Sequence, residues 1–288
     1  MTKWLILIGV IIILCVAEWM REIFTFKITH YDIVSEKLNK LTKEKRIVFL
    51  TDLHNNSYGT NNEKLLASVR EQNPDLILVG GDMLVGKPEA STKVAEDLVK
   101  KLTEISPVYY ANGNHEQRMK IYPERFGIKY QEYKTSVEQS GVQFLENEHI
   151  DLMFDSCPIQ IHGLEIPREG YKKFRKTNVF LEQIEERIGK ADSSKYQILL
   201  AHNPIYADTY LEWGADLVLS GHLHGGIVRL PGLGGMITPQ FRLLPKYSGE
   251  LTVKNGKSVV VSKGLGTHTI KIRFLNPAEL IVLHLKGK

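Results

Sequence analysis

Five short polar clusters carry histidine and carboxylate residues at spacings that suit metal binding. Each one directly follows a run of leucine and β-branched residues that predicts a buried strand. Open α/β sheets hold their ligands at the carboxyl ends of the strands, so this shared position predicts one common site. The clusters are Thr51-Asp52-Leu53-His54, Gly80-Gly81-Asp82, Gly113-Asn114-His115-Glu116, Ala201-His202-Asn203-Pro204 and Gly221-His222-Leu223-His224.

The residue types indicate which ions the site would bind. Imidazole and carboxylate together suit manganese, iron or zinc, whereas magnesium and calcium sites consist almost wholly of oxygen ligands. Any one cluster alone is more typical of a structural turn, but five in order predict a centre. Seven ligands exceed the needs of one tetrahedral ion, so we expect two divalent ions, with manganese preferred, about 3.5 to 4 Å apart and bridged by a carboxylate. The predicted ligands are Asp52, His54, Asp82, Asn114, His202, His222 and His224.

The other candidate ligand residues receive no role. Cys15 and Cys157 lie in unrelated segments and do not resemble a zinc site or a disulfide pair. Five histidines fall outside the clusters and are expected to be ordinary surface or core residues: His30, His149, His162, His268 and His284.

Hydrophobic periodicity predicts the elements that position the clusters. The first half has a βαβαβ layout, with strands at 47–51, 76–80 and 108–111 and helices at 62–71 and 91–102. Asn255-Gly256 between two valine-containing runs predicts a tight hairpin. Later strands are expected at 142–145, 160–164, 197–201, 217–220 and 227–230, with a helix carrying Leu181, Ile184 and Ile188. We expect three parts: an anchor at 1–21, a connector or first hairpin at 22–45, and one catalytic domain at 46–288.

The ordered motifs resemble the calcineurin-like metallophosphoesterase family over residues 50–226. Within it, a bacterial branch of membrane-anchored or exported phosphodiesterases looks most similar, because it adds an apolar N-terminus and a glycine- and proline-rich stretch like that at 229–235. The resemblance implies an α/β fold, a four-layer αββα sandwich of two mixed sheets. It also implies that Asp52, His54 and His224 hold one ion, that Asn114, His202 and His222 hold the other, and that Asp82 bridges them.

The resemblance leads us to expect a metal-dependent phosphohydrolase, preferably a phosphodiesterase, that cleaves phosphodiester or pyrophosphate bonds with a hydroxide bridging the two ions. His115 is the expected proton donor to the leaving oxygen, and Glu116 is expected to be a helix or loop contact. The alternatives are a docking module of the same fold without turnover and a phosphomonoesterase. A net charge of +4 and a pI near 8.8 lack the strong basic character of a nuclease, so no nucleic-acid partner is expected.

The N-terminus predicts membrane association. Trp4 to Ala17 is an unbroken apolar run, and counting the flanking residues to Met20 makes it long enough for a thin bilayer. We expect an uncleaved single anchor in the cell membrane through residues 4–20, with a cleaved signal peptide or a buried helix as alternatives. The positive charges favour a cytoplasmic domain only weakly, and an exported domain stays open.

Three further stretches bear on the substrate, which the sequence predicts only as a phosphate ester that could be lipid-linked. The aromatic residues of 119–133 would either stack on a base or sugar or, as we prefer, pack a helix face. Residues 230–245 would either admit acyl chains or form a folded-over loop, and the basic run 171–176 would either contact anionic headgroups or form a solvated turn. The sequence predicts no oligomeric state.

Overall fold

Two mixed sheets form the centre of the computed structural model, which describes residues 2–172, 177–226, 229–230, 234–235, 245–267, 273 and 275–288. The first sheet has the order β1 (Phe26–Val34), β14 (Ala278–Lys286), β2 (Lys45–Leu50), β3 (Leu76–Val79), β4 (Val108–Tyr110) and β5 (Gln143–Phe144). The second has the order β12 (Glu250–Lys254), β13 (Lys257–Val261), β9 (Leu217–Ser220), β8 (Tyr196–Ala201), β7 (Cys157–Leu164) and β6 (His149–Phe154). A short ribbon pairs β10 (Arg229–Leu230) with β11 (Gly234–Gly235).

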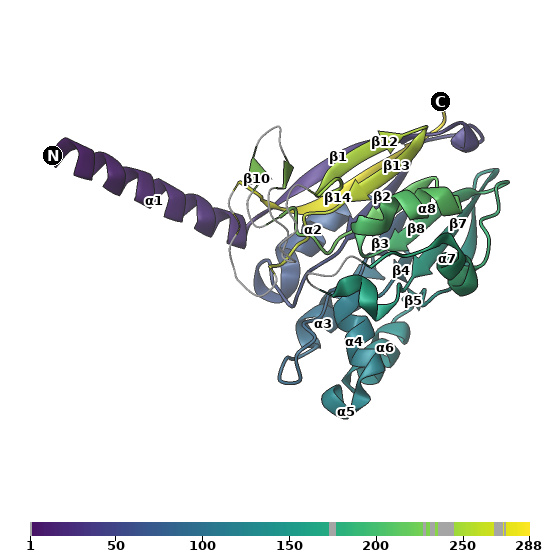
Figure 1. Ribbon diagram of the computed structural model, residues 1–288, viewed down its shortest axis with the longest axis horizontal. Coiled ribbons are helices and arrows are strands. Elements are labelled where there is room, and N and C mark those ends of the chain that lie inside the picture. Colours follow the sequence, from purple (N-terminus) through teal and green to yellow (C-terminus); the bar gives the residue numbers. More distant parts are fainter. Residues whose placement is uncertain are drawn as a thin grey trace.

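The two sheets pack face to face, and helices cover their outer faces (Figure 1). The first sheet carries α2 (Glu63–Glu71), α3 (Lys93–Leu102), α4 (Asn114–Ile121), α5 (Pro123–Phe126) and α6 (Lys129–Glu138). The second sheet carries α7 (Leu181–Ile188) and α8 (Ala207–Trp213). Short 3₁₀ turns lie at η1 (Glu36–Leu38), η2 (Thr60–Asn62), η3 (Arg168–Tyr171) and η4 (Pro204–Tyr206). The predicted four-layer sandwich of two mixed sheets is confirmed.

Side chains that alternate along the strands form three apolar layers: one between the two sheets and one between each sheet and its helices. In β2, Ile47 and Phe49 point between the sheets, whereas Val48 and Leu50 point toward the helices. The strands of the second sheet repeat this arrangement, so that Ile198 faces the first sheet and Leu199 faces α7 and α8. Because side chains alternate along a strand, continuous apolar runs are what a sheet buried on both faces requires.

The predicted strands and helices of the first half are present with ends shifted by a few residues. The Asn255-Gly256 turn is also confirmed, because both residues have the positive φ of a type I′ turn, 52° and 75°. Of the aromatic residues of 119–133, Phe126, Tyr130 and Tyr133 are buried in the first sheet's helical layer, which confirms the packed-face interpretation for these three, whereas Tyr122 is exposed. Residues 227–228, 231–233 and 236–244, and the basic residues 173–176, lie outside the described residues.

The segment expected to be a connector contains a strand of the first sheet. β1 pairs in parallel with β14 over nine residues, from Phe26 opposite Ala278 to Val34 opposite Lys286. β14 in turn pairs antiparallel with β2. This pairing joins segments near the two ends of the sequence and has no local sequence signature. Residues 22–45, expected to be a connector or first hairpin, thus include a strand of the first sheet that begins at Phe26.

Helix α1 (Thr2–Phe24) precedes β1 and projects from the body of the molecule (Figure 1). Its stretch from Lys3 to Phe24 has 22 residues and contains an 18-residue window with a mean hydropathy of 2.2, and its large apolar side chains are mostly exposed. A helix of that length and composition is sufficient to cross a bilayer, although an N-terminal signal sequence has the same properties.

His162 on β7 is a buried neutral histidine and predicts a pH effect on stability. Its Nε2 lies 3.0 Å from Oε1 of Gln160 and 2.9 Å from Oε1 of Gln197, and burial lowers its pKa to about 4. In the unfolded chain the pKa is about 6.5, so between these values only the unfolded chain binds the proton. The contribution of His162 to the free energy of unfolding is therefore fully present above about pH 6.5 and is lost as the pH falls toward 4.

The free energy of unfolding should fall between pH 6.5 and 4 in both the unchanged protein and His162→Gln. We expect the fall to be about 2 kcal/mol smaller in His162→Gln, because glutamine does not titrate. Urea unfolding followed by circular dichroism across this pH range measures the difference. The same pH dependence in both proteins would contradict the burial of a neutral His162.

Candidate metal centre

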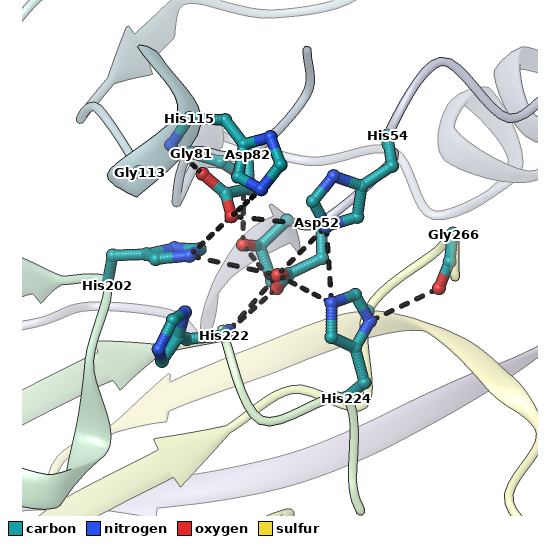
Figure 2. A network of polar contacts seen from close by, with 12 residues as sticks. Asp52, His54, Gly81, Asp82, Gly113, His115, His202, His222, His224 and Gly266 are labelled. Atoms are coloured by element: carbon teal, nitrogen blue, oxygen red, sulfur yellow. Dashed lines mark hydrogen bonds and ion pairs between the residues drawn. The ribbon is translucent and has the colours of Figure 1, made fainter. Parts of the chain in front are cut away.

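The five predicted clusters converge at one edge of the sandwich. The motif loops follow β2, β3, β4, β8 and β9, and their carboxyl ends lie together where the two sheets meet (Figure 2). Asp52 and Asp82 occupy the middle of this site, and the imidazoles of His54, His202 and His224 point toward them.

The backbone of these loops is turned to aim the side chains inward. Five of the predicted ligands have positive φ values: Asp52 (53°), His54 (47°), Asp82 (51°), His222 (68°) and His224 (49°). Each such residue costs about 1 to 3 kcal/mol, and strain of this kind persists at functional sites where the surrounding structure compensates for it. This concentration indicates that the loops are shaped for binding rather than for folding alone.

Asp52, His54 and His224 form a group of the right size for one ion. The Nε2 atoms of His54 and His224 are 3.2 Å apart, and Asp52 Oδ1 lies 3.7 Å and 3.4 Å from them. Two ligands bound side by side at about 2.1 Å from an ion are about 3 Å apart, so these distances suit shared coordination. His224 Nδ1 donates to the carbonyl oxygen of Gly266 at 3.2 Å, which leaves its Nε2 lone pair for the ion.

A second group adjoins the first through Asp82. Asp82 Oδ2 lies 3.1 Å from His202 Nε2 and 3.9 Å from His54 Nε2, so the carboxylate is between the two groups. Ligand atoms of Asp82, His202 and His222 lie within 4.8 Å of one another. His202 Nδ1 donates to the carbonyl oxygen of Gly80 at 2.8 Å, which again directs Nε2 at the centre.

Asn114 supplies an observation that fits a metal directly. It is the first residue of α4, and its Oδ1 is buried without a hydrogen-bond partner among the described residues. A buried amide oxygen without a partner costs about 1 to 3 kcal/mol, and a coordinated cation would satisfy it. The donor set as a whole, with imidazoles, carboxylates and one amide oxygen, suits two divalent metal ions.

The charges at the site also match this interpretation. Burial by itself would raise the pKa of Asp52 and Asp82, but the charges of nearby imidazoles, His202 foremost for Asp82 and His224 for Asp52, lower both values. Burial would lower the pKa of His202, yet Asp82 and Asp52 raise it to about 10. Protonated histidines therefore balance the buried carboxylates in the metal-free protein, and bound dications would replace these protons.

His115 faces the centre in a third group that overlaps the other two: its ligand atom and those of His54 and Asp82 lie within 4.8 Å of one another. Its Nε2 lies 3.9 Å from Asp82 Oδ2, and its Nδ1 accepts a hydrogen bond from the Gly86 amide at 2.7 Å. An amide can only donate, so Nδ1 is unprotonated and the ring hydrogen is on Nε2. His115 therefore presents an N–H donor to the centre.

Glu116 holds the motif loops in register, which agrees with its expected role as a loop contact. Its Oε2 accepts from the amides of Asp82 at 2.8 Å and Gly113 at 3.2 Å. Its Oε1 accepts from the Leu84 amide and the Tyr110 hydroxyl, both at 3.0 Å. Burial, followed by the charge of Asp82, raises the pKa of Glu116 to about 7.

The loop after β13 supports His224, and the sequence motifs did not identify it. Asn276 Nδ2 donates to the carbonyl oxygens of His224 at 2.6 Å and Gly226 at 2.7 Å. Arg273 donates to the carbonyl oxygens of Gly264 and Gly266, the second of which also binds His224. The available signal was Gly264-Leu265-Gly266, which follows the β-branched run that ends at Val261 after two intervening residues.

The chain belongs to the calcineurin-like phosphoesterase family, whose model matches residues 45–226. An uncharacterized metallophosphoesterase from Helicobacter pylori (strain J99) is 30% identical over 257 residues, covering 87% of this chain and 62% of that protein. One from Aquifex aeolicus is 26% identical over 272 residues, covering 93% of this chain and 94% of that protein. The chain thus spans about three fifths of the first relative's length and nearly all of the second's.

Two more comparisons concern membrane association and fold. A transmembrane protein with a metallophosphoesterase domain from Danio rerio is 25% identical over 270 residues, covering 90% of this chain and 57% of that protein. The solved structure of the sulfate thiohydrolase SoxB from Thermus thermophilus is similar with a TM-score of 0.50 at 14% identity, covering 88% of this chain and 57% of that one. This likeness shows the fold alone.

Gly221 allows the second sheet's loop to approach Asp52. A Cβ atom at Gly221 would lie 2.0 Å from Asp52 Oδ2, which is far inside van der Waals contact. We expect Gly221→Ala to displace the carboxylate and to lower manganese occupancy about tenfold at equal free metal, because one ligand of the first group moves. Metal analysis after equilibrium dialysis measures the occupancy.

The matched control is Gly9→Ala in α1, where the added Cβ meets no atom within 4 Å. Circular dichroism verifies that both variants are folded. A folded Gly221→Ala protein with unchanged manganese occupancy would show that this close approach does not position a ligand.

Proposed function

We propose that this chain is a dinuclear metal phosphohydrolase that cleaves phosphodiester or pyrophosphate bonds. The observation that carries the proposal is the pair of ligand groups joined at Asp82, with His115 facing the same centre. Two divalent ions bound there would polarise the phosphoryl oxygens and lower the pKa of the attacking water. Manganese is the proposed ion, because the donors mix imidazole with oxygen; iron and zinc also suit this set.

The chain's own residues orient the reaction. Asp52, His54 and His224 are the proposed ligands of one ion, and Asp82 is the proposed shared ligand. The proposed ligands of the other ion are Asn114, His202 and His222.

His115 is the proposed donor to the leaving oxygen, with one change from the sequence-based hypothesis. The Gly86 amide keeps Nδ1 unprotonated, so the neutral ring offers its Nε2 hydrogen as a hydrogen bond to the charge that develops on the leaving oxygen. A neutral imidazole can stabilise an oxyanion in this way without first becoming an imidazolium. Complete proton transfer from an imidazolium would require the contact with Gly86 to break.

We further propose that α1 is an uncleaved membrane anchor and that the centre lies close to the bilayer surface. β1 begins at Phe26, directly after α1, opposite the first residue of β14. Because β14 runs antiparallel to β2, its start lies at the carboxyl end of β2, where Asp52 follows. Two strand spacings, about 10 Å, therefore separate the anchor's end from the site, which supports a lipid-linked phosphate ester as substrate.

The buried end of α1 strengthens this proposal. Glu22, in the last turn, is only 1% exposed, although most of the helix is exposed to solvent. The helix end therefore rests against the folded body, and the distance between anchor and centre is held by packing rather than by a free linker.

We expect His115→Gln to lower kcat about 100-fold on bis(p-nitrophenyl) phosphate while keeping both manganese ions, because a donor to the leaving oxygen contributes in the transition state and not to metal binding. Steady-state rates and metal analysis on the same preparation measure the two effects. Full activity with both ions bound would refute the role of His115. A metal-loaded unchanged protein that hydrolyses no phosphate ester would instead refute the enzyme and favour a docking module.

Removal of residues 1–21 tests the anchor and keeps Glu22 on the folded body. We expect the shortened protein to leave the membrane fraction and to act on a phosphate ester embedded in vesicles at least ten times more slowly, because the local substrate concentration is lost. Rates on the water-soluble aryl diester should stay within about twofold. Equal rates on vesicles for both proteins would contradict a surface-bound site.

A further inference from the structure

A cavity of about 250 Å³ adjoins the metal centre. Two of its lining residues, His54 and His115, belong to the centre, and three others, Lys87, Arg118 and Arg125, are cations. In the part of the chain that the structure describes, none of the three forms an ion pair with a carboxylate. Basic side chains around a cavity, without acidic partners, indicate that the cavity binds an anion.

Arg118 is the innermost part of this charge cluster and has an unmet hydrogen-bond donor. One of its terminal nitrogens donates to the Gly86 carbonyl oxygen, but its Nε is buried without a partner among the described residues. Burial lowers the pKa of Arg118, and the charges of Arg168 and Arg125 add to this effect while that of Asp82 opposes it, so like charges lie close together here. A bound anion would satisfy the donor and relieve the repulsion.

Phe126 holds the two arginines next to each other. The guanidinium carbons of Arg118 and Arg125 lie 5.8 Å and 5.5 Å from the centre of its ring. Stacking of this type restricts long side chains and leaves their planar N–H edges free to bind oxygen atoms. The cavity is therefore more than a set of mobile surface cations.

The cavity lies on the leaving-group side of the centre. His115, the proposed donor to the leaving oxygen, lines both the cavity and the centre. A substrate whose phosphorus is at the metals and whose leaving oxygen meets His115 would extend its leaving group into the cavity. The chemistry of the cavity thus defines the leaving group.

We propose that this cavity, the anion pocket formed by Lys87, Arg118 and Arg125, binds a second phosphate of the substrate. This inference rests on the proposed phosphohydrolase function and assigns its substrate to the pyrophosphate class. The oxygen of water bonds to the phosphorus at the metals, and the bond from that phosphorus to the bridging oxygen breaks. Its electron pair stays on the bridging oxygen, the second phosphate leaves through the anion pocket, and the protons of water are shared between the two phosphate products and solvent.

Lys87→Gln and Arg125→Gln test the pocket, because both side chains are exposed and neither takes part in the hydrogen bond from Arg118 to Gly86 or in that from Gly86 to His115. The measured quantity is the ratio of kcat/KM for dodecyl diphosphate to kcat/KM for bis(p-nitrophenyl) phosphate, which lacks a second phosphate. We expect each variant to lower this ratio about tenfold at unchanged manganese content. Lys190→Gln, which removes an exposed cation after α7, is the matched control and should leave the ratio unchanged.

A binding measurement separates failure of the pocket from failure of the proposed function. Isothermal titration calorimetry of the manganese-loaded protein compares methylenediphosphonate with methylphosphonate, and we expect the preference for the first to fall about tenfold in Arg125→Gln. If the protein hydrolyses the diester but neither the kcat/KM ratio nor the binding preference changes in the variants of Lys87 and Arg125, the proposed anion pocket is wrong and the phosphohydrolase function stands. Absence of all hydrolysis, with binding still dependent on Arg125, would support the pocket as an anion site and overturn the phosphohydrolase.

Discussion

The main electrostatic constraint on this structure is that the negative charges of two buried carboxylates, Asp52 and Asp82, must be compensated. Both are almost completely removed from water, at 0% and 1% exposure, and an isolated buried charge is strongly unfavourable. Histidines from both sheets, His54 and His115 from the first and His202 and His224 from the second, supply the compensating charge. The two sheets are therefore joined by electrostatics at this edge and by apolar packing elsewhere. Because dications can replace the protons on these histidines, the same charge balance suits the site to divalent metal ions.

The surroundings of these carboxylates have little freedom. Gly113 and Gly221 admit Asp82 and Asp52 at distances that a Cβ atom would block, and Glu116 holds the loops after β3 and β4 together. Asn276, near the C-terminus, holds the backbone of His224 in place by donating to its carbonyl oxygen. These contacts compensate for the strained backbone at the proposed ligands, and they explain why glycine and amide residues accompany the proposed metal-binding side chains.

Sequence patterns predicted the local features well and the non-local ones poorly. The clusters around Asp52 and His222 were predictable because strand ends and glycine turns are encoded within about ten neighbouring residues. The pairing of β1 with β14 joins residues about 250 positions apart, and no local pattern specifies it. The support that Asn276 gives to His224, and the tautomer of His115 set by Gly86, likewise depend on contacts that exist only in the folded chain.

The central claim is that Asp82 joins two metal ions in one centre. Anomalous X-ray diffraction from crystals of the manganese-loaded protein, recorded at the manganese edge, tests it most directly. The account predicts two peaks about 3.5 to 4 Å apart, with Asp82 in contact with both and Asn114 Oδ1 in contact with one. A single peak at full occupancy, or two peaks of which only one contacts Asp82, would contradict it.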